Sequence, residues 1–180
     1  MTDVVEGIAA VGISGSPSRA SRSRALLGAA LAALERRGIA TREIDLAALP
    51  AEALLGRSTD EQVTDALAAV RRARILVVST PVYRATYSGL LKVFFDLLPQ
   101  DGLAGKVAVA IATGASLGHL LAVDHGLRPL LTSVGALPVA TAVYGTDAQF
   151  RDGRPDPALI EQIDRAVAEA LALVTSPVPA

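Results

Sequence analysis

Residues 12–27, which read GISGSPSRASRSRALL, begin as the end of an apolar strand and finish as the start of a helix. The turn between these two segments holds five serines, three arginines and one proline. A strand that runs through a short polar turn into a helix is the first part of a βα unit. The stretch therefore favours an α/β fold, and it raises the question of what so many hydroxyls and guanidiniums do in one turn.

The composition supports the same fold class. Hydrophobic residues make up 51% of the 180 residues and aromatic residues only 3%, so the core must consist of Ala, Val, Leu and Ile. This mixture is typical of buried parallel strands that helices cover on both faces. Because the length suits one well-filled core, we expect a single domain over 1–180, with its core at about 7–175 and a short flexible C-terminal tail.

Apolar runs with β-branched residues alternate with segments of helical period along the chain. The apolar runs predict five strands, at 8–14, 41–46, 74–80, 106–113 and 137–145. The periodic segments predict five helices, at 24–37, 59–72, 88–98, 117–134 and 156–174. Because no hairpin signal joins successive strands, we expect one parallel sheet with right-handed crossovers, in the order 2-1-3-4-5.

The charge balance and the rare residue types exclude several function classes. Seventeen basic and eighteen acidic residues nearly cancel, so no long-range field attracts nucleic acid or an anionic membrane. The chain has no cysteine and only two histidines without a metal-binding motif, so we expect no thiol chemistry and no metal site. An acidic N-terminus and the lack of a long apolar run predict a cytoplasmic protein rather than a secreted or membrane protein.

The turn in 12–27 has the properties of a phosphate site. In a doubly wound sheet, ligands bind at the carboxyl ends of the strands, in the loops after strands 1, 3 and 4. The start of the following helix offers free backbone N–H groups and the positive end of the helix dipole. Hydroxyls of Ser16, Ser21 and Ser23 and the guanidinium of Arg22 add donors for a phosphate monoester. The alternative is a solvated turn in which Ser16 or Ser23 is a helix N-cap.

Other loop chemistries fail on spacing. Gly12 and Gly15 are followed by Ser16 and Pro17, which breaks the dinucleotide fingerprint GxGxxG, and the GK[ST] of a P-loop is absent. Gly12 and Ser14 match the first half of the hydrolase motif GxSxG, but residue 16 is Ser where the motif needs Gly. The turn therefore indicates binding rather than nucleophilic catalysis.

The loops after the third and fourth predicted strands suit a planar ring. In the first, Pro81, Val82 and Tyr83 provide a flat wall and backbone polar groups, although its tyrosines could equally pack at a subunit contact. In the second, the small residues of ATGAS at 112–116 permit close backbone approach to a ring. A phosphate at one loop and a ring between two others describe a mononucleotide site.

Four motifs in matching order carry a resemblance to a known family. They are GSPSRASRS at 15–23, STPVYRATYSGLLKVFFDLLP at 79–99, LAGKVAVAIATG at 103–114 and GHLLAVDHGLRPLL at 118–131. Together they resemble the NAD(P)H-dependent FMN reductases, in particular the branch that supplies reduced flavin to sulfonate monooxygenases. The similarity extends from the first strand to about residue 150.

The resemblance implies a flavodoxin-like three-layer sandwich that binds FMN at the three loops. By this resemblance, the FMN phosphate is held by Ser16, Ser21, Arg22 and Ser23. The side of the flavin lies along Pro81, Val82, Tyr83 and Arg84. The ring system meets Thr113, Gly114, Ala115 and Ser116. Ala115 stands where the family's pattern has a second glycine.

The resemblance also implies an activity. NADPH, or NADH, would pass hydride directly to FMN, so no catalytic side chain is required, and reduced FMN would leave for a partner monooxygenase in sulfonate desulfurisation. One alternative is a flavoprotein that retains FMN and reduces quinones, azo compounds or metal oxyanions. A second alternative is a non-enzymatic flavodoxin-like electron carrier, which the near-neutral charge disfavours.

Two further stretches carry structural expectations. The apolar residues of GLLKVFFDLLP at 89–99 surround nearly the whole helix, so we expect an apolar face that a homodimer or homotetramer covers, as in the family. Pro129 prevents a regular helix at His125, and Gly126 makes a bulge with an i to i+5 turn easier. Sulfonate-linked members of the family carry tyrosine at this position, and the histidine here departs from that pattern and resembles the methanesulfonate-type branch. The resemblance makes His125 a candidate for flavin retention or the interface, and the alternative is an ordinary helix residue.

Overall fold

The predicted strands form one parallel sheet in the computed structural model, which describes residues 9–175. The sheet consists of β1 (Ala9–Ser14), β2 (Ala40–Asp45), β3 (Ile75–Pro81), β4 (Val107–Gly114), β5 (Leu137–Pro138) and β6 (Val143–Thr146). Its order is β2-β1-β3-β4-β5, and β6 also pairs with β4, which confirms the predicted order. Residue 8 of the first predicted strand and the predicted flexible tail at 176–180 lie outside the described residues.

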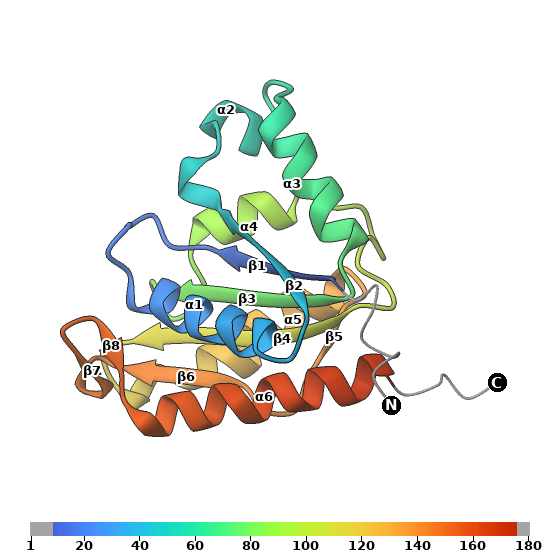
Figure 1. The fold of residues 1–180 in the computed structure, drawn as a ribbon. Helices are drawn as coiled ribbons and strands as arrows, with labels where there is room; N and C mark the ends of the chain where they lie inside the picture. The colour runs from blue at the N-terminus through green and yellow to red at the C-terminus, as the bar shows by residue number, and fades with distance from the viewer. Residues whose placement is uncertain (1–8, 176–180) are drawn as a thin grey trace.

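Helices cover both faces of this sheet, so the predicted three-layer arrangement is confirmed (Figure 1). One face packs against α1 (Arg22–Glu35) and α6 (Pro157–Thr175). The other face packs against α2 (Ala51–Leu54), α3 (Glu61–Arg72), α4 (Gly89–Phe95) and α5 (Arg128–Ser133). Among the described residues, none of these helices is both long and apolar enough to cross a membrane.

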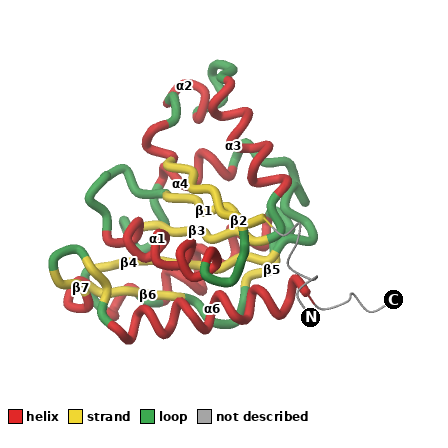
Figure 2. Tube along the Cα trace, viewed as in Figure 1, coloured by secondary structure: helices red, strands yellow, loops and turns green. Residues whose placement is uncertain are grey.

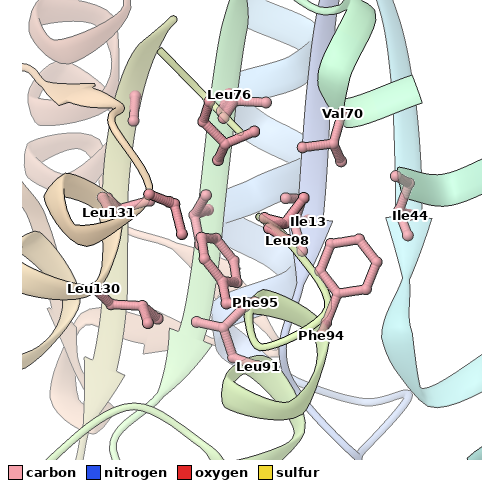
Figure 3. Packing of buried hydrophobic residues seen from close by; sticks show 14 of the residues in the cluster. Ile13, Ile44, Val70, Leu76, Leu91, Phe94, Phe95, Leu98, Leu130 and Leu131 are labelled. Carbon is pink, nitrogen blue, oxygen red and sulfur yellow. The ribbon is translucent and has the colours of Figure 1, made fainter. Parts of the chain in front are cut away.

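The core is built where β3 and β4 meet the helices. β3 is buried along its whole length, as is β4 up to its last residue, and most of their residues are Val, Ile, Leu and Ala. Phe94 and Phe95 of α4 insert their rings into this layer beside Ile13 and Leu76 (Figure 3). The two rings lie edge to face, with 6.3 Å between their centroids. This packing holds the C-terminal end of α4 against the sheet.

The prediction of one continuous strand over 137–145 is wrong. The strand splits into β5 and β6, because side chains replace some of the sheet hydrogen bonds of the residues between them. Arg128 donates to the carbonyl oxygens of Val139 and Ala140, and Glu169 accepts from the backbone N–H of Thr141. The backbone N–H of Val139 still donates to the carbonyl of Ala108 on β4, so the break is held by a sheet hydrogen bond as well as by these side chains.

The prediction of one helix over 117–134 is also corrected. The segment holds a short 3-10 turn at Leu117–His119, a π-helix at Val123–Leu127 and then α5. The backbone N–H of Arg128 donates to the carbonyl of Val123, five residues back, which confirms the i to i+5 turn expected from Pro129. The irregular segment places Gly126 against the loop after β3.

A β-hairpin between β6 and α6 was not predicted. β7 (Phe150–Arg151) and β8 (Arg154–Pro155) pair antiparallel across Asp152 and Gly153, which both have positive φ. This Asp-Gly pair is the usual signal for a two-residue hairpin turn, but the strands are too short to show an alternating pattern. Figure 2 shows this hairpin and the loop after β1 at the same end of the sheet, beyond the carboxyl ends of its strands.

Candidate functional site

A cavity of about 370 Å³ lies at the carboxyl end of the parallel strands. The loops after β1, β3 and β4 all line it, as the switch-point rule for such sheets predicts. Nine of the twelve predicted loop residues line it, namely Ser16, Ser21, Arg22, Pro81, Val82, Tyr83, Thr113, Gly114 and Ala115. Ser23, Arg84 and Ser116 are not among its lining residues, and neither is His125.

The loop after β1 is anchored where it leaves the sheet. The backbone N–H of Gly15 donates to the carbonyl of Ser79 at 2.8 Å, and the buried hydroxyl of Ser88 donates to the carbonyl of Gly15. Ser88 also caps α4, because its hydroxyl accepts from the N–H of Leu91. One serine therefore ties the loop after β1 to the helix that follows β3.

The serines of this loop divide between structural and cavity-facing roles. Ser21 is the N-cap of α1, where the alternative reading expected Ser16 or Ser23. The hydroxyl of Ser23 is buried and lies 2.8 Å from that of Ser21, while the carbonyl of Ser23 accepts from Ser79. The hydroxyl of Ser16 bonds to the backbone of Ser18. Ser23 thus shapes the turn from behind, and Ser16 and Ser21 reach the cavity.

Arg22 forms an ion pair with Asp147, which follows directly after β6. Both side chains are about half exposed, at 44% and 51%. Asp147 also lines the cavity, and so do Ser18 and Ala20 of the loop after β1. These three residues were not predicted from the sequence, although the switch-point rule, applied to the last strand as well, points to Asp147.

The loop after β3 presents an aromatic side chain on a tight turn. The backbone N–H of Val82 donates to the carbonyl of Thr113 at 2.7 Å, so the strand pairing continues beyond β3. Tyr83 and Thr86 exchange backbone hydrogen bonds across Arg84 and Ala85. These two residues have φ values of 50° and 71°, a conformation that favours glycine, so the turn holds backbone strain. The turn leaves the Tyr83 ring 48% exposed at the cavity.

The loop after β4 is held by Tyr144 of β6. The Tyr144 hydroxyl donates to the carbonyl of Ser116 at 2.7 Å, and burial raises the pKa of this hydroxyl, so it stays a donor. A Cβ at Gly114 would lie 2.3 Å from the Tyr144 hydroxyl, so only glycine fits there. Ser116 therefore anchors the loop through its backbone, while Gly114 and Ala115 face the cavity.

His125 lies exposed on the π-helix, outside the cavity lining. Its neighbour Gly126 packs against the turn after β3, where a Cβ would lie 2.3 Å from the Oγ1 atom of Thr86. The π-helix thus supports the turn that carries Tyr83. This contact connects the irregular helix to the site without bringing His125 into it.

The cavity combines two chemically different ends. At one end, the start of the 14-residue helix α1 and the guanidinium of Arg22 suit an anion. At the other end, the Tyr83 ring and the backbone of Gly114 and Ala115 suit a flat ring. A phosphorylated ring compound such as FMN fits this arrangement, because each part meets groups of matching chemistry.

The chain is similar in sequence to several flavin reductases. Residues 8–151 match the family model of the NADPH-dependent FMN reductases. An FMN reductase (NADPH) of Pseudomonas putida is 37% identical over 164 residues, which cover 89% of this chain and 83% of that protein. The NADH-dependent FMN reductase SfnE, also of Pseudomonas putida, is 40% identical over 163 residues, or 88% of each chain.

Solved structures agree with this match. The apo form of an NADH:FMN oxidoreductase, EMOB, superimposes with a TM-score of 0.86 at 40% identity and covers 94% of this chain and 92% of its own. A flavodoxin of Streptococcus pneumoniae, at 14% identity and a TM-score of 0.61, shares the fold alone over 92% of this chain and 98% of its own. The chain therefore belongs to the NADPH-dependent FMN reductase family and is an NAD(P)H:FMN oxidoreductase.

Proposed function

We propose that this enzyme reduces FMN as an exchangeable substrate and delivers the reduced flavin to a partner monooxygenase that desulfurises a sulfonate. The observation that carries the proposal is the single cavity that joins the start of α1 and Arg22 to the Tyr83 ring and the loop after β4. The partner and its sulfonate substrate rest on the resemblance of the four sequence motifs to the sulfonate-linked branch. The similarity to FMN reductases of Pseudomonas putida supports the role of FMN as the compound that is reduced.

In this proposal each loop has one task. The backbone N–H groups at the start of α1, the hydroxyls of Ser16 and Ser21 and the guanidinium of Arg22 hold the phosphate. Pro81, Val82 and Tyr83 lie along the flavin, with Arg84 at the tip of the same turn. Ser23 and Ser116 act from outside the cavity, because they hold the turn before α1 and the loop after β4 in place.

The residues of the ring end orient the reactants and exclude water. FMN supplies the chemistry when it is bound, because its ring accepts hydride from NAD(P)H. The Tyr83 ring offers a face against which a planar group can stack, and the small side chain of Ala115 and the backbone of Gly114 permit close approach. Positioning is the main contribution of such a site to the rate.

The decisive experiment is the oxidation of NADPH and of NADH by protein from which all flavin has been removed. Turnover should require added FMN and should saturate with its concentration, and without oxygen reduced FMN should accumulate on the enzyme-free side of a dialysis membrane. If turnover instead needs a quinone, azo compound or metal oxyanion while FMN stays bound, the protein is a retained-flavin reductase. If NADPH and NADH are not oxidised at all, the electron-carrier alternative replaces the proposal.

We also propose that the protein is a homodimer or homotetramer. The exposed apolar face of α4 is smaller than expected. Leu91, Phe94 and Phe95 are buried, and Leu90 and Val93 are half-buried against the core. Three exposed apolar side chains lie beside the π-helix instead, with Leu117 at 70%, Leu121 at 60% and Leu120 at 45%. Sedimentation equilibrium at micromolar concentration should show an oligomer, and a monomer would contradict this proposal.

A further inference from the structure

Arg22, at the end of the cavity where we place the FMN phosphate, already has an acidic partner within the chain. Arg22 is the first residue of α1, and its guanidinium pairs with the carboxylate of Asp147. Asp147 lines both the cavity of about 370 Å³ and an adjoining cavity of about 710 Å³, and Ser21 and Arg22 also line both. The ion pair therefore lies between two cavities, at the place where a phosphate would bind.

The position of Asp147 is set by the sheet rather than by the ion pair. β6 pairs with β4, with Thr146 opposite Gly114, so Asp147 follows directly at the sheet's carboxyl edge. The side-chain oxygen of Gln149 accepts from both the backbone N–H and the hydroxyl of Thr146, which closes a short 3-10 turn over Asp147–Gln149. This turn keeps a carboxylate beside Arg22 when the ion pair is broken.

The ion pair contributes little to the stability of the fold. Both side chains are about half exposed, and ion pairs of this kind contribute little to the stability of a fold. A phosphate group carries more charge than a carboxylate and also meets the backbone N–H groups at the start of α1, so it can displace Asp147 from Arg22. Binding must then break the ion pair first, and this requirement lowers the apparent affinity.

We propose that Asp147 competes with the flavin phosphate for Arg22, so that it weakens FMN binding and speeds FMN release. The inference rests on the proposed function, since it assumes that the cavity binds FMN with its phosphate at Arg22. Asp147 is a positioning residue here, because it acts through Arg22 and not on the reacting atoms. Asp147 weakens only the binding of the phosphate group, so the affinity for a flavin without phosphate does not depend on Asp147.

The test compares FMN and riboflavin binding to flavin-free protein by quenching of flavin fluorescence. Asp147→Asn keeps the side-chain shape and removes its charge, and it should tighten FMN binding about two- to five-fold, as expected for an exposed ion pair. Riboflavin binding should not change. Asp152→Asn is the matched control, because it removes the same charge from the neighbouring hairpin outside both cavities, and it should leave both affinities unchanged.

A double variant separates competition from simple repulsion. In an Arg22→Ala background, Asp147→Asn should no longer tighten FMN binding, because the guanidinium for which Asp147 and the phosphate compete is absent. Equal tightening with and without Arg22, equal tightening of riboflavin, or no tightening at all would each overturn the inference. Stopped-flow measurement should also show slower FMN release from Asp147→Asn.

The outcome for Arg22→Ala alone distinguishes this inference from the proposed function. If Arg22→Ala weakens FMN but not riboflavin while Asp147→Asn has no effect, only the competition is wrong. If Arg22→Ala weakens both flavins equally, the phosphate assignment itself fails and the competition falls with it. Thermal unfolding of each variant, with Asp147→Ala as a second substitution, shows whether a change in affinity reflects a change in fold.

Discussion

The hydroxyl of Tyr144, on β6, donates a hydrogen bond of 2.7 Å to the backbone carbonyl of Ser116, in the loop after β4. The ring reaches this carbonyl by passing over Gly114, where no side chain would fit. The last strand of the sheet therefore determines the shape of a loop that faces the candidate flavin site, although neither Tyr144 nor Ser116 lines the cavity.

Tyr144→Phe should lower the free energy of unfolding by about 0.5–1.5 kcal/mol, the usual net contribution of one hydrogen bond. We expect a larger KM for FMN with little change in kcat, because the freed loop must be ordered again when flavin binds. Urea unfolding and steady-state kinetics measure the two effects. Tyr87→Phe, the same chemical change in the loop after β3, is the control, and equal effects of both variants would contradict the role of Tyr144.

Arg22→Ala should weaken FMN binding by about 1.5 kcal/mol and leave riboflavin binding nearly unchanged. This value is at the low end of the range for hydrogen bonds to charged groups, because the Arg22 side chain is 44% exposed and already paired with Asp147. Fluorescence titration with both flavins measures the difference. Arg24→Ala, which removes a guanidinium paired with Glu43 and Asp45, should not discriminate between the two flavins.

Gly126→Ala should destabilise the protein by about 1–3 kcal/mol, because the new Cβ would lie 2.3 Å from the Oγ1 atom of Thr86. The loss should be smaller in a Thr86→Ala background, where that atom is absent. Gly28→Ala is the matched control on α1, because a Cβ there meets nothing within 4 Å, and we expect it to be neutral or stabilising. Thermal unfolding of the four variants checks the assignment, and an unchanged cost in the Thr86→Ala background would refute it.

Glu169→Gln should destabilise the protein at neutral pH by about 1 kcal/mol. Hydrogen bonds from the hydroxyl and the backbone N–H of Thr141 hold the pKa of Glu169 below its ordinary value. A carboxyl whose pKa is lower in the folded state contributes stability above its unfolded pKa, near 4.3, and loses it as the pH falls through the folded value.

The difference in unfolding free energy between wild type and Glu169→Gln should therefore be largest above pH ~5 and should shrink below pH ~4. Urea unfolding across this range measures it. Glu161→Gln, at an exposed position on the same helix, should show no such trend. A difference that is independent of pH would mean that Thr141 does not depend on the charge of Glu169.

His125→Tyr should slow FMN exchange and lower turnover while leaving the fold intact. The residue lies on the π-helix, next to the contact between Gly126 and the turn that carries Tyr83, so a larger aromatic side chain adds apolar surface close to the site. The FMN content of the purified protein and the rate of FMN release report the effect. His125→Ala shows whether loss of the imidazole alone suffices, and a His125→Tyr protein with unchanged turnover and affinity would show that the position has no such role.

The sequence by itself determined most of the strands and helices and the order of the strands in the sheet. Alternation of β-branched apolar runs with segments of helical period predicts the strands and helices, and parallel connections leave few possible sheet orders. The position of Pro129 after Gly126 predicts the irregular turn, because proline affects its own helix and no other element. The switch-point rule then predicts which loops meet, because it depends only on the order of the strands.

Only the tertiary structure decided which of the predicted groups face the cavity and which hold it together. The break between β5 and β6 depends on Arg128 and Glu169, which reach it from two different helices. Ser23 turns inward because the start of α1 packs on β3, and Asp147 reaches Arg22 because β6 lies beside β4. Each of these contacts joins two different elements of the fold, so no local pattern of spacing or hydropathy contains it; it exists only once folding has brought the two segments together.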